Sequence, residues 1–152
     1  MPRCHILSII TNCAQTLHAL RVLRCHGLPG DAVQTVYRAA VGTKLLYGCC
    51  AWSGFITASD RKRVDALLRR SKRCGFCPPD LPPFNDLIEA QEDQLFSTIN
   101  HNPQHLLHCL PPSAASQSYD LRQRAHTRSL PNRARHLVDS NFISRIIFKD
   151  MY

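Results

Sequence analysis

The sequence predicts an all-α protein, and three observations support this fold class. Apolar residues recur at three- and four-residue spacing in several long segments, as on the buried face of a helix. Gly, Asp, Ser or Thr stands at the ends of these segments, where helices are capped. The 10 prolines cluster in the middle and the C-terminal third, where they interrupt helices. We expect a small bundle of three helices at about 12–26, 31–52 and 60–74, then a proline-rich connector, a helix at about 85–99, and a basic, partly disordered tail.

The first predicted helix carries a leucine stripe. Leu17, Leu20 and Leu23 recur close to helical spacing. Gly27 is a suitable C-terminal cap, and Pro29 follows directly beyond it. The helix should therefore end near residue 26.

The second predicted helix begins at Asp31, which we expect to act as its N-cap. The segment Leu45–Tyr47 is apolar on most sides, and such a stretch is normally buried. Gly42 and Gly48 weaken the helix locally, so we expect a kink or an early end.

The third predicted helix is amphipathic and strongly basic. Thr57 or Ser59 should cap it, and its apolar stripe consists of Val64, Leu67, Leu68 and Ser71. Seven cations stand against Asp60 and Asp65, which leaves a segment charge of +5. These cations are Arg61, Lys62, Arg63, Arg69, Arg70, Lys72 and Arg73.

Paired prolines in the segment 75–83 predict a connector in which no helix continues. Asn85 or Asp86 should start the fourth helix, which is acidic, and residues 101–110 form a short segment that is a further helical candidate. The small, polar residues 113–118 read as a linker, and Phe142–Ile147 as a short amphipathic helix near the end of the tail. The domains expected from these features are 1–13, 14–77, 78–112 and 113–152.

A net charge of +8 and a pI near 9.3 indicate a polyanionic partner, with nucleic acid first and an anionic membrane second. A basic soluble protein without such a partner is the plain alternative. The 8 cysteines are scattered and unlike a secreted disulfide framework, so we expect reduced thiols in a cytoplasmic or nuclear protein that is not secreted. The N-terminal apolar run is too short and broken for a signal peptide. We expect no membrane span, with 39–52 as the nearest candidate.

Several ordered stretches then suggest a family. They are Leu17–Leu28 (LHALRVLRCHGL), Val36–Ala40 (VYRAA), Leu46-Tyr47, Ala51–Phe55 (AWSGF), Ser59–Arg61 (SDR), Arg73–Leu81 (RCGFCPPDL), Tyr119–His126 (YDLRQRAH), Asp139–Phe142 (DSNF) and Phe148–Tyr152 (FKDMY). Together they resemble the region downstream of the polymerase palm in non-LTR (LINE-type) retrotransposon reverse transcriptases, of the arthropod, tick transposon-like kind. The resemblance runs from about Ala14 to Tyr152, and the first dozen residues diverge from it.

The resemblance implies a helical thumb and a C-terminal extension, in which the thumb grips the primer–template duplex. It also implies that the chemistry lies elsewhere, because the family's catalytic carboxylates come partly from an aromatic-Ala-Asp-Asp hairpin and two-metal catalysis requires such converging groups. No Asp-Asp pair occurs in this chain. We therefore expect a non-catalytic fragment of an RNA-directed DNA polymerase, with no enzyme activity and no cofactor. An inactive pseudogene product and a domesticated protein–protein interaction module are the alternatives, and protein partners are unknown.

Other chemistry has little support in the sequence. Cys74 and Cys77 have the spacing of a zinc-ligand pair, but a structural zinc site needs four ligands and no second Cys-x-x-Cys exists. The candidates for a second pair are His101, His105, His108 and Cys109, which lie far along the chain. The place of Cys74 and Cys77 after a helix and before prolines also disfavours a redox motif. The chain has no Gly-x-Ser-x-Gly elbow and no phosphate-binding glycine loop.

The remaining functional signal is the basic residues, which we expect to contact the backbone of RNA or DNA. The candidates are Arg61, Lys62, Arg69, Arg70, Lys72 and Arg73 in the third helix and Arg122, Arg124 and Arg128 in the tail. Charge pairing between the third helix and the acidic helix at 85–99 is the alternative, and it would consume much of the basic surface.

Overall fold

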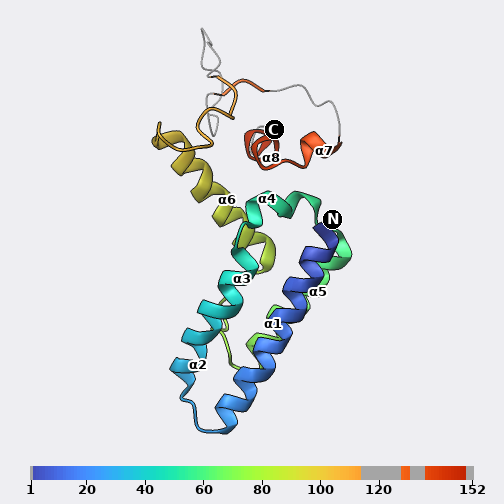
Figure 1. Ribbon diagram of the computed structural model, residues 1–152, viewed down its shortest axis with the longest axis vertical. Coiled ribbons are helices and arrows are strands. Elements are labelled where there is room, and N and C mark those ends of the chain that lie inside the picture. Colours follow the sequence, from blue (N-terminus) through green and yellow to red (C-terminus); the bar gives the residue numbers. More distant parts are fainter. Residues whose placement is uncertain (1, 114–127, 131–135, 150–152) are drawn as a thin grey trace. The chain divides into compact units, whose positions relative to one another are not determined.

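The computed structural model describes residues 2–113, 128–130 and 136–149. It is helical, which confirms the all-α class (Figure 1). The chain divides into two compact units, Met1–Glu89 and Ala90–Tyr152. The boundary lies within a helix, so the domain boundaries expected from the sequence at 77 and 112 stay predictions.

The first unit is a bundle around the helix α1, Pro2–Cys25. This helix starts ten residues earlier than expected, because Ile6 and Cys13 continue the buried stripe of Leu17 and Leu20 toward the N-terminus. Leu23, which the spacing placed in that stripe, is 46% exposed. The predicted C-terminus is nearly correct, since α1 ends one residue before the expected position.

Two glycines end the long helices of this unit in the same way. Gly27 has a φ of 95°, its N–H donates to the Arg24 carbonyl, and the next N–H reaches back to the Leu23 carbonyl. Gly75 has a φ of 68° and terminates its helix with the same pair of bonds, from Gly75 to Lys72 and from the next residue to Ser71. This is the Schellman arrangement, which favours glycine because of the positive φ.

The expected second helix is broken into shorter pieces. They are α2 (Gly30–Tyr37), a π-helical turn (Arg38–Gly42), α3 (Thr43–Leu46), α4 (Cys49–Trp52) and a 3₁₀ turn (Ser53–Phe55). The N-cap prediction was wrong: Pro29 occupies that position, and Asp31 lies in the first turn. The expected early end is confirmed at Gly48, whose left-handed φ of 59° turns the chain and leaves Tyr47 78% exposed.

The basic third helix is α5, Ala58–Arg73, and its predicted limits are confirmed to within two residues. Thr57 is the N-cap, because its hydroxyl oxygen accepts from the Asp60 N–H at 3.2 Å. The same hydroxyl donates to the buried Asp60 carboxylate at 2.6 Å. The predicted apolar stripe of this helix is buried at all four positions, Val64, Leu67, Leu68 and Ser71.

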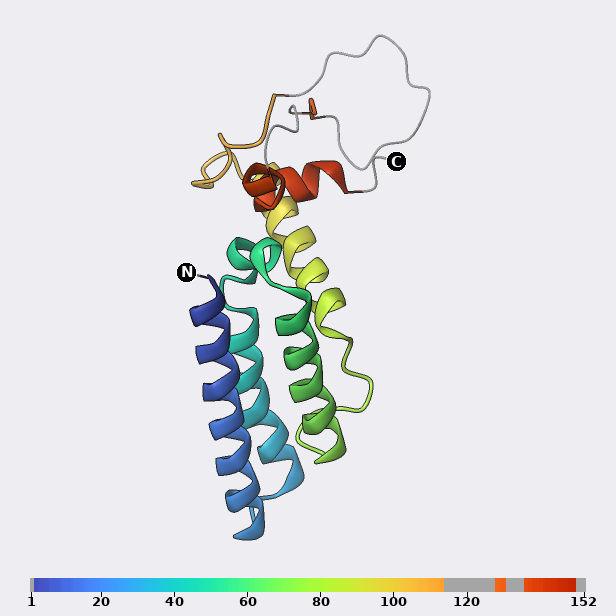
Figure 2. The same cartoon turned by 90° about the vertical axis from the view of Figure 1, so that its right-hand side faces the viewer.

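α1 and α5 lie side by side and run in the same direction, with α2 and α3 antiparallel to both (Figures 1 and 2). Their apolar faces share one core. Trp52 closes that core, stacking on Phe84 at 6.1 Å between ring centroids and donating its indole N–H to the Tyr47 carbonyl. The parallel course places the C-terminal ends of α1 and α5 at the same end of the unit, which positions the basic residues considered below.

The last helix to begin in the first unit is α6, Phe84–His101. It starts one residue before the expected caps, and the Phe84 N–H is met by the Asp65 carboxylate of α5 at 3.4 Å. Beyond His101 the chain forms a series of turns, so the expected helix at 101–110 is not present in that form.

The second unit contains the rest of α6 together with α7 (His136–Asp139) and α8 (Phe142–Phe148). α8 confirms the short amphipathic helix expected there, and Asn141 caps it through its side chain. Glu92 pairs with Arg145, and Asp93 with Lys149 at 2.8 Å. Glu92 and Asp93 of α6 therefore have partners within their own unit, in α8 and at its C-cap.

Candidate nucleic-acid interface

The cations of α5 divide into structural and available groups. Arg61 donates to Asn85 at 2.7 Å and to the Ser53 carbonyl at 3.2 Å, so it ties α5 to neighbouring segments. Lys72 donates to the Leu81 carbonyl and holds the proline connector. Both are candidates from the sequence that the structure shows in intramolecular contacts.

The other four candidates of this helix, Lys62, Arg69, Arg70 and Arg73, are exposed. None of them makes an ion pair or a side-chain hydrogen bond within the described residues. Lys62, Arg69 and Arg73 follow the spacing i, i+7, i+11, which places them along one side of α5. We call these three residues the basic stripe.

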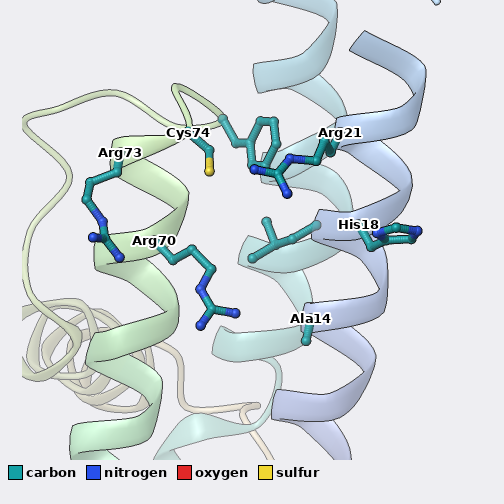
Figure 3. Close-up of a pocket in the computed structure, with 8 residues that line it drawn as sticks. Ala14, His18, Arg21, Arg70, Arg73 and Cys74 are labelled. Atoms are coloured by element: carbon teal, nitrogen blue, oxygen red, sulfur yellow. The ribbon is translucent and has the colours of Figure 1, made fainter. Parts of the chain in front are cut away.

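A hollow of about 440 Å³ lies between α1 and α5 (Figure 3). Arg21 extends from α1 toward α5, and Arg70 extends from α5 toward α1. We call this cavity the arginine hollow. Its lining residues are Ala14, Leu17, His18, Arg21, Arg70, Arg73, Cys74 and Phe76, so no carboxylate lines it.

A fourth arginine, Arg24, contacts two of the lining residues, Cys74 and Phe76. Arg24 donates to the Cys74 carbonyl, and its guanidinium lies over the Phe76 ring at 4.8 Å from the centroid. The carbonyl ends of two parallel helices carry partial negative charge, which basic side chains stabilise. Arg24 satisfies the carbonyl of Cys74, the C-cap of α5, whereas Lys72 donates to Leu81 in the connector. Arg21, Arg70 and Arg73 make no such contact among the residues that the structure describes.

Sequence reasoning missed Arg21 and His18 as site residues. Arg21 and Arg24 stand three residues apart, as do Arg70 and Arg73. This repeated spacing near the ends of two helices was the available signal. It does not reveal that the two helices run in parallel, and only that alignment brings the pairs together.

Of the three tail candidates, the structure describes only Arg128. Arg122 and Arg124 lie outside the described part of the chain. Arg128 lies within it, and its guanidinium donates to the Pro112 carbonyl at 3.1 Å and to Asn100 at 2.9 Å. Arg128 therefore has a structural role within the second unit.

The two cysteines considered as zinc ligands lie in different environments. Cys74 is the half-buried C-cap of α5 and borders the arginine hollow, whereas Cys77 is 3% exposed in the core. Within residues 2–113, 128–130 and 136–149, no group of three or more His, Cys, Asp or Glu side chains is placed to hold a metal ion. His101 and His108 each place a ring nitrogen 2.7 Å from a backbone carbonyl oxygen.

The interior of the first unit holds a group of titratable side chains. Burial raises the pKa of the Cys13 thiol and that of the Cys77 thiol. Burial also raises the pKa of Tyr37 to about 12, and a contact with Ser71 opposes this only in part. These groups are protonated at neutral pH and are enclosed by the core, so they lack the access that a nucleophile requires.

One described helix has the length and composition of a membrane span. It is the Cys4–Cys25 part of α1, with a mean hydropathy of 1.2, and not the segment 39–52 that the sequence suggested. The core helix of a bundle meets the same criterion, but only 28% of this window is buried, with Ile6, Cys13, Leu17 and Leu20 on the buried face. The location of the protein stays a prediction.

Comparison of the chain with family models, with curated proteins and with solved structures finds no match. The resemblance to a retrotransposon enzyme therefore rests on the quoted stretches of sequence alone.

Proposed function

We propose that this chain is a non-catalytic fragment of a retrotransposon reverse transcriptase that binds the backbone of RNA or DNA through the basic stripe of α5. The observation that carries the proposal is the set of exposed cations on α5 without intramolecular partners. The sequence resemblance supports the origin, and the lack of an Asp-Asp pair supports the absence of polymerase chemistry. A primer-extension assay of the chain should give no product.

The length of the stripe suits a polynucleotide. Lys62 and Arg73 are 11 residues apart, which corresponds to about 16 Å along a helix. One strand of a duplex places about five phosphates along that distance, at roughly 3.4 Å each. The three cations therefore face several phosphates at once, and such contacts carry no sequence information.

The pairing of α6 with α8 also favours this proposal. Had Glu92 and Asp93 faced the basic stripe, they would have neutralised it. Their partners are instead Arg145 and Lys149, within the second unit.

Binding to an RNA–DNA duplex of about 20 base pairs, measured by fluorescence anisotropy at 50 and 200 mM salt, tests the proposal. Three phosphate contacts predict a salt slope near −3, so affinity should fall about 40-fold across this range. Lys62→Gln/Arg69→Gln should reduce the slope by about 2. The matched control is Arg38→Gln/Lys44→Gln, which removes the same charge from two exposed residues outside α5.

No binding at 50 mM salt would refute the proposal, as would equal affinities of the stripe variant and the control variant. The binding experiment and a pull-down together address the alternatives. An inactive product would bind no nucleic acid. If the chain is a protein-interaction module, a pull-down after nuclease treatment should recover a protein partner.

A further inference from the structure

We infer that the arginine hollow binds a phosphoryl group carrying two negative charges, such as the terminal phosphate of a nucleic-acid strand or a free diphosphate. This inference rests on the proposed function, because it names the chemical group that the same basic surface would select. Its site is the hollow, which Arg21, Arg70 and Arg73 line, and only Arg73 is shared with the basic stripe.

The first support is convergence. Arg21 comes from α1 and Arg70 from α5, and the two side chains extend toward each other across the hollow (Figure 3). Cations that follow a continuous backbone form a row along one element, as Lys62 and Arg69 do. Cations on opposite walls of a cavity instead enclose a single group.

The second support is charge balance. Arg21, Arg70 and Arg73 line the hollow, no carboxylate lines it, and none of the three has a partner among the described residues. A phosphodiester carries one negative charge, whereas a terminal phosphate carries about 1.5–2 at pH 7. Two or three guanidinium groups therefore match the terminal group better. Arginine also offers a planar pair of N–H donors, which binds phosphate oxygens in a bidentate manner.

The third support is the state of the helix ends. The carbonyl groups at the C-terminal ends of α1 and α5 would repel an anion. Arg24 donates to the carbonyl of Cys74, the C-cap of α5, and Lys72 is engaged with the Leu81 carbonyl in the connector. The other three arginines are thus left for a ligand, and a volume of about 440 Å³ lies within the range of small-molecule sites.

The experiment compares two single-stranded DNA 12-mers of one sequence, labelled at the 3′ end, with either a 5′-phosphate or a 5′-hydroxyl. Fluorescence anisotropy with the full chain should show about tenfold tighter binding of the phosphorylated strand, the factor that one charge-assisted contact supplies. Arg21→Lys/Arg70→Lys should bring this ratio to about one, because lysine keeps the charge but loses the bidentate fork. The affinity of this variant for the RNA–DNA duplex should change less than about twofold.

Arg38→Lys/Arg63→Lys is the matched control, because it makes the same exchange at two exposed residues outside both the hollow and the basic stripe, and it should keep the tenfold ratio. Thermal unfolding of each variant checks that it is folded. Inorganic pyrophosphate then separates the two sources. Displacement of the phosphorylated strand supports a free diphosphate as a ligand, and a retained preference without displacement supports the strand end.

Equal, salt-dependent affinity for the two strands would overturn this inference and leave the proposed function standing. If no nucleic acid binds but pyrophosphate binds in a manner sensitive to Arg21→Lys/Arg70→Lys, the proposed function fails and the hollow remains a phosphoryl site. If neither binds, both are refuted.

Discussion

Replacing Tyr37 with phenylalanine measures how much the buried Tyr37 hydroxyl contributes to the free energy of unfolding. The side chain is 3% exposed. Ser71 and Cys77 lie against the hydroxyl, yet it makes no hydrogen bond of acceptable geometry within the described residues. An unsatisfied buried hydroxyl costs about 1–3 kcal/mol. We therefore expect Tyr37→Phe to leave the free energy of unfolding at pH 7 unchanged or to raise it by about 1 kcal/mol, whereas most core substitutions lower it.

The same substitution should change the response to alkali. The pKa of Tyr37 rises from its ordinary value of 10 to about 12 in the folded chain, mainly because of burial. Above pH 10 the unfolded chain therefore loses this proton while the folded chain keeps it. The resulting stability is complete below pH 10 and is lost as the pH rises toward 12, by roughly 1 kcal/mol at pH 11 and roughly 3 kcal/mol in all.

Urea unfolding of both proteins at pH 8 and pH 11 measures the effect. The wild type should lose roughly 1 kcal/mol more than Tyr37→Phe between these two values. Burial raises the pKa of the Cys77 thiol and a contact with the Tyr37 hydroxyl lowers it in part, so both proteins should also carry Cys77→Ala in this comparison. Tyr47→Phe, at a residue that is 78% exposed, should behave as the wild type does. Parallel losses in wild type and Tyr37→Phe would show that the hydroxyl ionises without penalty, and the reasoning from burial would be wrong.

Three further substitutions test the fold by urea unfolding. Ile6→Ala should lower the free energy of unfolding by about 2–5 kcal/mol, because the Ile6 side chain is 1% exposed. Leu7→Ala, at a residue that is 39% exposed, should lower it by less than about 1 kcal/mol. Equal losses would show that the start of α1 does not pack in the core. Gly75→Ala should lower the free energy of unfolding by about 1–2 kcal/mol, because Gly75 has a positive φ. Gly42→Ala should raise it by about 0.5 kcal/mol, because the φ of −58° at Gly42 suits alanine. Thr57→Ala should cost about 2 kcal/mol through the lost cap, and Thr57→Ser, which keeps the hydroxyl, should cost far less.

Features that depend on interactions between residues close in sequence were predicted correctly, and features that depend on packing between distant segments were not. α5 was predicted well because its cap at Thr57, its apolar stripe and its terminal Gly75 are all local signals. The start of α1 was missed because the residues between Ile6 and Cys13 mix apolar and polar side chains, so the buried stripe is evident only when its packing partners are known. The breaks around Gly48 were expected in kind. Their positions depend on how Trp52 seats in the core, which spacing does not reveal.

The candidate site shows the same division. Residues along one helix, such as Lys62 and Arg69, follow from helical spacing alone. The arginine hollow requires two helices to run in parallel with their ends level, and this is a property of the whole bundle. Arg21 was therefore not among the predicted site residues, although it lines the hollow together with Arg70.

Stabilisation of the helix ends explains some of the arginines at this site but not all of them. Charge at a helix C-terminus acts within the last turn and contributes about 0.3–1 kcal/mol per residue. Arg24, Arg70 and Arg73 lie in the last turns of α1 and α5, so part of their presence follows from the parallel helices alone. Arg21 lies before the last turn of α1, where this effect has largely decayed, and it is exposed. An exposed cation without a partner in the described structure gains little from folding, so Arg21 is the member of the set for which binding an anion is the stronger explanation.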